Sequence, residues 1–280
     1  MSHFRTLYIG TDYEEDFAPY SEQDENFYTP QDRTKSVRED YKKYGPEYRK
    51  NGKAKNAVEF AMMWLGIDTL IDKATLLPEQ VETKVNVYNA KKQRHVIANG
   101  NRLVKVVDFY NSNAKYDYYS MEKDLTGTFN PKEMLEKNRE YNRNFYRKVV
   151  GILGHQPQFT SFEELMKQVE EEQGGRGEDF FNKVGDLYWE QPDIKVLDEN
   201  GIRVDADIRC TEEEYVKKAC LPFFAIVTSE GWFEQVQCGW WGTTVGEEMP
   251  SEKWSELQMQ VVEKALKNPE AEVWLFDCHI

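Results

Sequence analysis

The chain has 280 residues, of which 40% are apolar and 14% aromatic, so it can bury a sizeable core, which excludes disorder as its global state. Fifty acidic against 36 basic residues give a net charge of −14, which disfavours direct binding to nucleic acid or to an anionic membrane. There is no signal-peptide pattern and no run of the ~18 apolar residues that cross a bilayer, so we expect a cytoplasmic protein.

The N-terminal part begins with a predicted strand. Residues 3–9 (HFRTLYI) are rich in β-branched and aromatic side chains and stop at a Gly-Thr-Asp turn. Residues 11–55 then carry mixed charge and three prolines. This composition predicts an extended or locally helical surface segment with little core of its own.

A helix and two strands are predicted next. Apolar residues recur at helical spacing from Val58 onward, which predicts a helix over residues 57–73 that Pro78 closes. Residues 85–88 and 103–109 are apolar and β-branched, so we expect two strands here, with a turn at Asn99-Gly100.

The middle of the chain predicts helices and one hairpin. Asn130-Pro131 is typical of a helix start, and Thr160 or Ser161 can cap a further helix that a glycine cluster ends near residue 174. Asn200-Gly201 lies between two short apolar runs, which predicts a hairpin over residues 194–204.

The C-terminal part predicts two helices and three strands. Thr211 and Glu214 form a capping box for a short helix, and Ser251 is the expected cap of the last helix. A hairpin is expected over residues 223–236, and residues 273–278 are the final strand. We therefore predict a single α+β domain over residues 1–280, with an antiparallel or mixed sheet and helices mainly on one face. A ferredoxin-like core with an inserted helical subdomain at about 131–215 fits this pattern.

Four separated segments carry a resemblance. They are residues 1–4 (MSHF) leading to Ile9-Gly10, residues 113–119 (NAKYDYY), residues 239–242 (GWWG) and residues 277–280 (DCHI). Together they resemble a family of uncharacterised accessory proteins of tailed phages. The resemblance implies a phage protein in the host cytoplasm and no known activity. Where that family has Gly-Gly-Arg-Trp, this chain has residues 122–125 (EKDL), so no catalytic role carries over.

Two aromatic segments are candidate binding surfaces. Tyr116, Asp117 and Tyr118, with Lys115 beside them, could place two rings and a carboxylate at one surface, to stack on a base or to anchor a partner. The alternative is that Tyr116 and Tyr118 are core residues on one side of a strand. Trp240 and Trp241 lie between glycines, which predicts that at least one indole is exposed for a partner; the alternative is that the pair caps the core.

The histidines near the two termini are the candidate catalytic residues. If the terminal strands are adjacent, His3, Asp277 and His279 come within reach of one another, and such a set could act in acid-base catalysis or hold a metal. The alternative is that both histidines are ordinary solvated or hydrogen-bonded side chains. The pattern requires no cofactor and no metal.

Three functions fit these observations. The leading hypothesis is a non-enzymatic phage accessory protein that binds and modulates or inhibits a host protein, for example an anti-defence factor. The second is an enzyme acting on a nucleotide or small anion through the terminal histidines. The third is a nucleotide-binding sponge that uses its aromatic faces. The sequence leaves the enzymatic question and the oligomeric state open and favours the binding protein.

Overall fold

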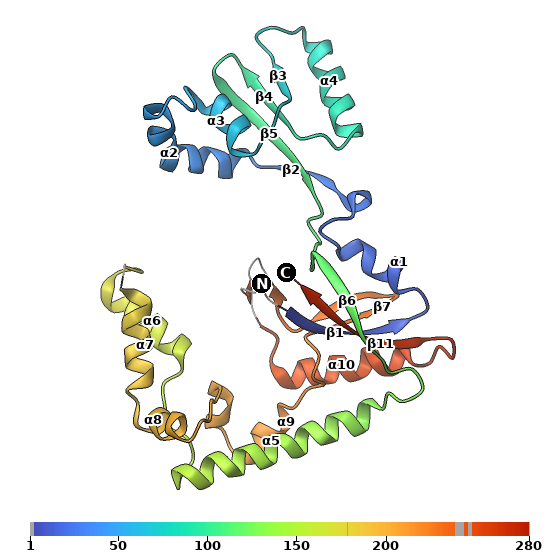
Figure 1. Ribbon diagram of the computed structural model, residues 1–280, viewed down its shortest axis with the longest axis vertical. Coiled ribbons are helices and arrows are strands. Elements are labelled where there is room, and N and C mark those ends of the chain that lie inside the picture. The colour runs from blue at the N-terminus through green and yellow to red at the C-terminus, as the bar shows by residue number, and fades with distance from the viewer. Residues whose placement is uncertain (1–2, 178, 239–243, 246–247, 280) are drawn as a thin grey trace. The chain divides into compact units, whose positions relative to one another are not determined.

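A computed structural model describes residues 3–177, 179–238, 244–245 and 248–279. It confirms the predicted α+β class, because helices account for 48% of the chain and strands for 21%. The chain forms two compact units (Figure 1). Unit 1 contains Asp12–Ser120 and the C-terminal residues from Cys278, and unit 2 contains His3–Thr11 and Met121–Asp277. A single domain was expected from the sequence, whereas the chain divides into two units that each have a hydrophobic core.

The main sheet has the strand order β6-β11-β1-β7-β8. Strands β1 and β7 are parallel and β7 and β8 are antiparallel, so the sheet is mixed, as predicted. Most of its residues belong to unit 2, and the ends of β6 and β11 belong to unit 1. A short antiparallel pair, β9 and β10, follows β8. The bounds are β1 His3–Gly10, β6 Tyr118–Asp124, β7 Ala225–Thr228, β8 Gly231–Glu234, β9 Gln237–Cys238, β10 Thr244–Val245 and β11 Glu272–His279.

The strand order corrects the ferredoxin-like prediction. In a ferredoxin-like βαββαβ sheet, the first of the four strands lies between the third and the fourth. Here the four strands compared with that pattern are β1, β7, β8 and β11, with β6 as an additional strand beside β11. Strand β1 lies between the fourth, β11, and the second, β7, and the third, β8, is at the edge.

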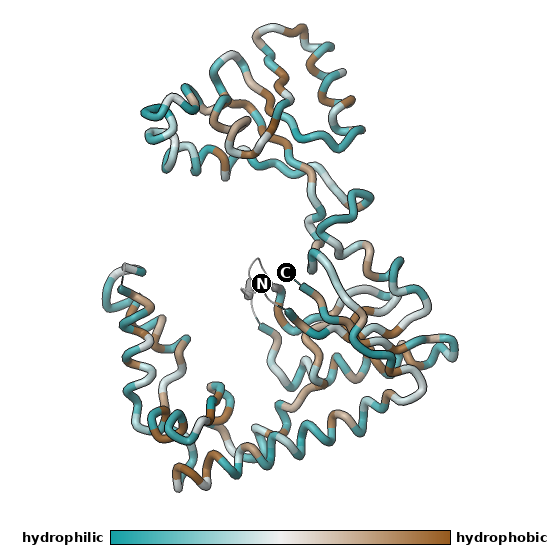
Figure 2. Tube along the Cα trace, in the orientation of Figure 1, coloured by the Kyte–Doolittle hydropathy of each residue, from teal (hydrophilic) through white to brown (hydrophobic). Residues whose placement is uncertain are grey.

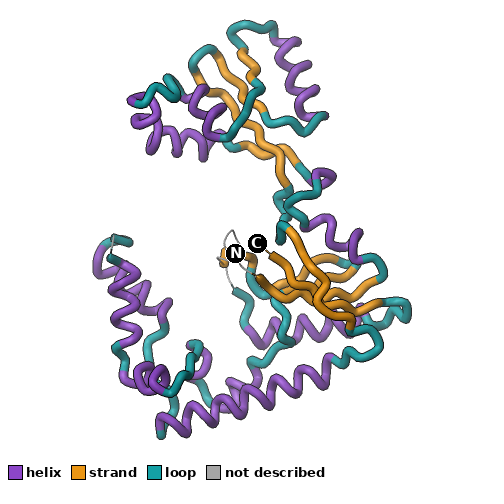
Figure 3. Tube along the Cα trace, in the orientation of Figure 1, coloured by secondary structure: helices purple, strands orange, loops and turns teal. Residues whose placement is uncertain are grey.

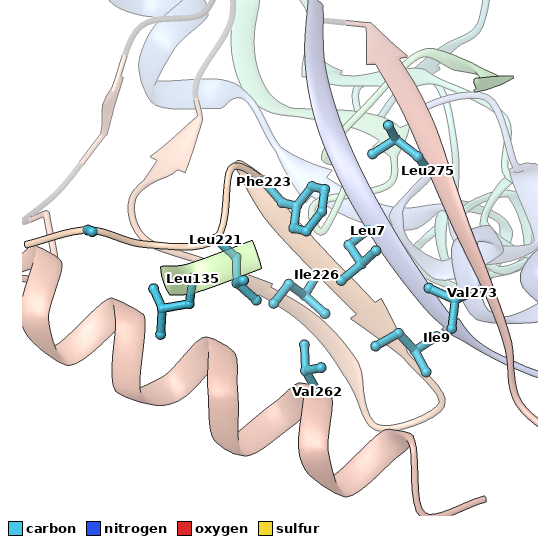
Figure 4. Packing of buried hydrophobic residues seen from close by; sticks show 10 residues of the cluster. Leu7, Ile9, Leu135, Leu221, Phe223, Ile226, Val262, Val273 and Leu275 are labelled. Carbon is cyan, nitrogen blue, oxygen red and sulfur yellow. The ribbon is translucent and has the colours of Figure 1, made fainter. Parts of the chain in front are cut away.

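Helix α10 (Ser251–Ala265) covers one face of this sheet. Leu7 and Ile9 of β1 and Ile226 of β7 point toward Val262 of α10, and Leu135 packs into the same cluster (Figure 4). Each fully buried aliphatic side chain contributes roughly 1.5–3 kcal/mol. The predicted N-cap was one residue late: the cap is Pro250, which has no side-chain hydrogen bond, and Ser251 is the first helical residue.

The predicted subdomain at 131–215 is built from helices and connecting loops (Figure 3). Asn130 and Ser161 cap α5 and α6 by accepting from the backbone N–H groups of Glu133 and Glu164, as expected. Gly174 ends α6 in the left-handed conformation, with φ at 69°. The helices are α5 Pro131–Leu153, α6 Phe162–Gln173, α7 Phe180–Trp189, α8 Pro192–Glu199, the 3-10 turn Ala206–Arg209 and α9 Glu212–Lys217.

The predicted hairpin at 194–204 is wrong. Pro192 starts helix α8, and Gly201, with φ at 66°, ends it. The Asn-Gly pair therefore supplies a helix terminus and not a β-turn. Ile194 and Leu197 are three residues apart and face the same core as Ile202, a spacing that suits one side of a helix. Val196, which alternates with Ile194 as in a strand, is exposed.

Unit 1 contains a second mixed sheet with the order β2-β5-β4-β3. Helices α2 and α3 cover it through a cluster that includes Val37, Phe60, Val96 and Val106. Helix α4 lies against the opposite edge, at β3. The bounds are α1 Tyr13–Phe17, 3-10 turns Ala18–Tyr20 and Glu25–Phe27, β2 Thr29–Asp32, α2 Thr34–Lys50, α3 Ala57–Trp64, β3 Leu70–Asp72, α4 Pro78–Ala90, β4 His95–Asn99 and β5 Arg102–Tyr110.

Three predictions in unit 1 need correction. The helix expected over 57–73 ends at Trp64, because Gly66 adopts φ of 62° and the chain turns into β3. Pro78 does not close a helix but begins α4. Residues 85–88, which were predicted to be a strand, are part of this helix. The segment 11–55 holds fully buried residues, so it contributes core. The hairpin turn at residues 99–100 is confirmed, between β4 and β5.

Candidate protein-binding surface

The aromatic segment in unit 1 separates into a buried and an exposed residue. Tyr116 is 4% exposed, its hydroxyl donates to the carbonyl of Phe17 at 3.0 Å, and burial raises the pKa of that hydroxyl. Tyr118 is 48% exposed. The two rings therefore form neither a shared stacking surface nor one side of a core. The backbone N–H of Lys115 donates to Tyr20 at 2.7 Å, which ties the segment to the chain after α1.

Asp117 and His279 form a close pair. Nδ1 of His279 lies 2.7 Å from Oδ1 of Asp117, and the ring of Tyr118 stacks on the imidazole with centroids 4.3 Å apart. The side chain of His279 is 5% exposed and its Nε2 is buried. A general base must reach the proton that it abstracts. His279 therefore has a structural role: its contacts with Asp117 and Tyr118 hold the end of the C-terminal strand in place.

His3 pairs with Asp277 and not with His279. Nδ1 of His3 lies 3.0 Å from Oδ2 of Asp277, and the two side chains are 53% and 35% exposed. The predicted set His3, Asp277 and His279 is therefore divided between two separate pairs. Within the described residues, no group of three His, Cys, Asp or Glu side chains has the arrangement of a metal site. Trp240 and Trp241, the remaining predicted binding residues, lie outside the described part of the chain.

A groove among the helices of unit 2 is a candidate site that the sequence analysis missed. It has a volume of about 240 Å³ and lies where α6, α7 and α8 meet the loop after α8. Trp189 is 41% and Phe162 37% exposed at this groove. The lining consists of Phe162, Tyr188, Trp189, Ile194, Leu197, Ile202, Arg203 and Val204.

The aromatic residues of the groove are held in defined positions. The ring of Tyr188 meets those of Phe162 and Trp189 edge-on, with centroids 5.8 and 5.2 Å apart. The guanidinium of Arg203 lies over the indole of Trp189, 5.5 Å from its centroid. Partly exposed Trp and Tyr side chains that are fixed before binding are typical of interface hot spots.

The helices around the groove are strongly acidic. Together α6, α7 and α8 carry nine carboxylates and three lysines. Glu190, Asp198 and Glu199 are exposed at the ends of α7 and α8, next to the lining residues in sequence. An apolar groove with an acidic rim is complementary to an amphipathic segment with basic flanks.

Arg209 holds the N-terminus of α6, which begins at Phe162, in place. Its guanidinium donates to the carbonyl of Phe159 at 2.9 Å and to Glu164 at 2.7 Å. The hydrogen bond from Arg209 lowers the pKa of the Glu164 carboxyl to about 2. These contacts join the start of α6, and with it Phe162 of the groove, to the 3-10 turn that contains Arg209.

This contact predicts a loss of helical stability in acid. Because the pKa of Glu164 is lowered on folding, its contribution is present above its ordinary value of 4.5 and is lost as the pH falls toward about 2. The thermal midpoint, followed by circular dichroism between about pH 5 and about pH 3, should fall less in Glu164→Gln than in the wild-type protein. Glu163→Gln is the matched control and should behave like wild type; equal falls in all three proteins would contradict the assignment.

The sequence holds a signal for this groove that the misassigned hairpin concealed. With residues 194–204 taken as strands, Ile194, Leu197 and Ile202 could not be placed beside Tyr188 and Trp189. A helix over 192–199 brings Ile194 and Leu197 to one side, since residues three apart share a helix face.

Comparison with known proteins adds no assignment. No family model, curated protein or solved structure matches the chain. Among the described residues, no helix has the length and apolar character required to span a membrane.

Proposed function

We propose that this protein is an accessory protein that binds and modulates another protein through the groove between α6, α7 and α8. The observation that carries the proposal is the half-exposed, pre-positioned Trp189 in an apolar groove on three acidic helices. The partner segment that fits is a basic amphipathic helix, whose apolar side would cover the indole and whose cations would face the rim. The resemblance to phage accessory proteins makes a host protein the expected partner.

Enzymatic function is the weaker alternative. The buried Nε2 of His279 is not presented to a substrate, and the pair of His3 and Asp277 lies on an exposed surface. The residues around the groove between α6, α7 and α8 include one arginine and no histidine or cysteine. A protein-binding role needs none of these groups.

The acidic rim gives a direct test. The double variant Asp198→Asn and Glu199→Gln should weaken partner binding several-fold and reduce its dependence on salt, because rim charges act through long-range attraction. The measurement is the affinity of the purified partner at low and high salt.

A matched control comes from the other side of unit 2. Glu252 and Glu256 on α10 are exposed and form no ion pair within the described residues. The double variant Glu252→Gln and Glu256→Gln should retain wild-type affinity. Equal weakening by the two sets would show that only the net charge matters and would contradict binding at the groove.

A further inference from the structure

The charge of the chain is distributed very unevenly. Residues 29–110, which form the second sheet and helices α2 to α4, contain 16 basic and 10 acidic residues. Their net charge is therefore +6, whereas the net charge of the whole chain is −14. All of these residues are described by the structure. The whole-chain charge therefore does not describe this part of unit 1, and the expectation that nucleic acid is repelled does not apply to its surface.

Four of these basic residues line a groove between α2 and β5. It has a volume of about 590 Å³ and is open to solvent. Four cations line it, three from α2 and one from β5, together with two carboxylates. The lining consists of Asp32, Thr34, Lys35, Arg38, Glu39, Lys42, Val104 and Lys105.

The three cations of α2 form a stripe. Lys35, Arg38 and Lys42 are spaced by three and four residues, so they lie on one side of the helix. Another side of α2 is fixed by Val37, which is buried in the core, and by Tyr41, which is half-buried against Phe60 of α3. In the hydropathy trace, α2 is mostly hydrophilic (Figure 2). The fold thus holds the stripe along the groove and prevents it from rotating inward.

The side chains of two of the four cations that line the groove form neither an ion pair nor a hydrogen bond with the described residues. Within the described chain, Lys35 and Lys42 form no ion pair, whereas Lys105 lies 3.9 Å from Asp32. Arg38 donates to the carbonyl of Leu103 at 3.1 Å and keeps its remaining donors.

Asp32 is already engaged within the protein. The hydroxyl of Thr34 donates to it and lowers the pKa of its carboxyl, and the N–H of Thr34 donates to the same oxygen. This carboxylate is thus occupied at the start of α2. Lys35 and Lys42 remain exposed, and no ion pair joins them to Glu39, the second carboxylate of the groove, or to any other residue that the structure describes.

We propose that this groove binds the phosphodiester backbone of a nucleic acid. A row of cations along a helix, facing a further lysine across an open groove, fits a chain of regularly spaced negative charges better than one small anion. The contacts are to phosphates, so binding does not depend on base sequence. The site lies in unit 1 and is independent of the groove on α6, α7 and α8.

The test is fluorescence anisotropy of a labelled oligonucleotide, single-stranded or duplex, with the full-length protein. The double variant Lys35→Gln and Lys42→Gln should bind about tenfold more weakly at ~0.1 M salt. The slope of log K against log salt should become shallower by about 1.4 for single strands or about 1.8 for duplex. Such a change in slope reports lost phosphate contacts, which a folding defect would not produce.

The control is a double variant with the same change in charge. Lys84→Gln and Lys91→Gln affect exposed lysines on and just after α4, at the opposite edge of the sheet, and should leave affinity and slope unchanged. Retained binding in this control with loss in the α2 variant supports the proposal. Equal loss in both variants would overturn it, and so would wild-type protein that binds inorganic triphosphate but neither oligonucleotide.

Discussion

Replacing Gln258 by alanine is expected to lower the free energy of unfolding by about 2–4 kcal/mol, the cost of leaving two buried polar groups unpaired. Gln258 of α10 is fully buried. Its Oε1 accepts from the N–H of Leu221 at 2.7 Å, and its Nε2 donates to the carbonyls of Leu221 and Phe223 at 3.2 and 3.3 Å. These bonds hold the chain that enters β7 against the helix.

The size of the effect follows from which groups lose their partners. The carbonyl of Leu221 also accepts from the N–H of Phe223, at 2.8 Å, and keeps that bond. The N–H of Leu221 and the carbonyl of Phe223 become unsatisfied inside the core. The urea midpoint of unit 2 should therefore fall by about 1 M or more.

A neighbouring glutamine provides the control for this prediction. Gln260 lies on the exposed side of α10, so Gln260→Ala should change the midpoint very little. If Gln258→Ala were as stable as Gln260→Ala, the three hydrogen bonds would not hold this segment.

Trp189→Ala is expected to weaken partner binding about 30-fold or more, which corresponds to a hot spot of ~2 kcal/mol or greater. The indole is 41% exposed in the free protein and is the largest apolar surface at the groove. Covering it on binding would remove that surface from water, and alanine offers little to replace it. Stability should change by less than about 1 kcal/mol, because the indole lies at the end of α7.

Phe181→Ala is the matched control on the same helix. Phe181 is 61% exposed and contacts Phe180, but it does not line the groove. Its removal should leave affinity within a few-fold of wild type. The affinities can be measured by calorimetry with the purified partner. Equal losses in the two variants would show that general surface hydrophobicity, and not the groove, causes binding.

Local signals in the sequence predicted some of the helix ends and the clearest hairpin correctly. The caps at Asn130 and Ser161 and the hairpin of β7 and β8 depend on a few adjacent residues, so they can be identified without knowledge of the tertiary fold. The strand order could not be predicted, because pairing between β1 and β7 depends on contacts between residues more than 200 positions apart.

The two strand predictions that were wrong share one physical cause. Short apolar runs at 85–88 and 194–197 fit both a strand and one side of a helix, and the flanking proline decides between them. In both cases Pro78 or Pro192 occupies the first helical position, where its missing N–H has no cost.

The candidate sites were harder to predict than the fold. Both Asp117 and His279 were named as candidates, yet their partnership depends on β6 lying beside β11. The basic surface on α2 was concealed by the acidity of the whole chain, since a net charge gives no information about where the charges lie.

Partner binding at the groove between α6, α7 and α8 can be tested by photo-crosslinking from position 189. A photoreactive phenylalanine analogue in place of Trp189 should form a covalent adduct with one host protein in lysate, through a basic amphipathic segment of that protein. The same analogue at Tyr141, which is 66% exposed on α5 and does not line the groove, should form none. Adducts from both positions, from neither, or only with a second copy of this chain would contradict partner binding at the groove.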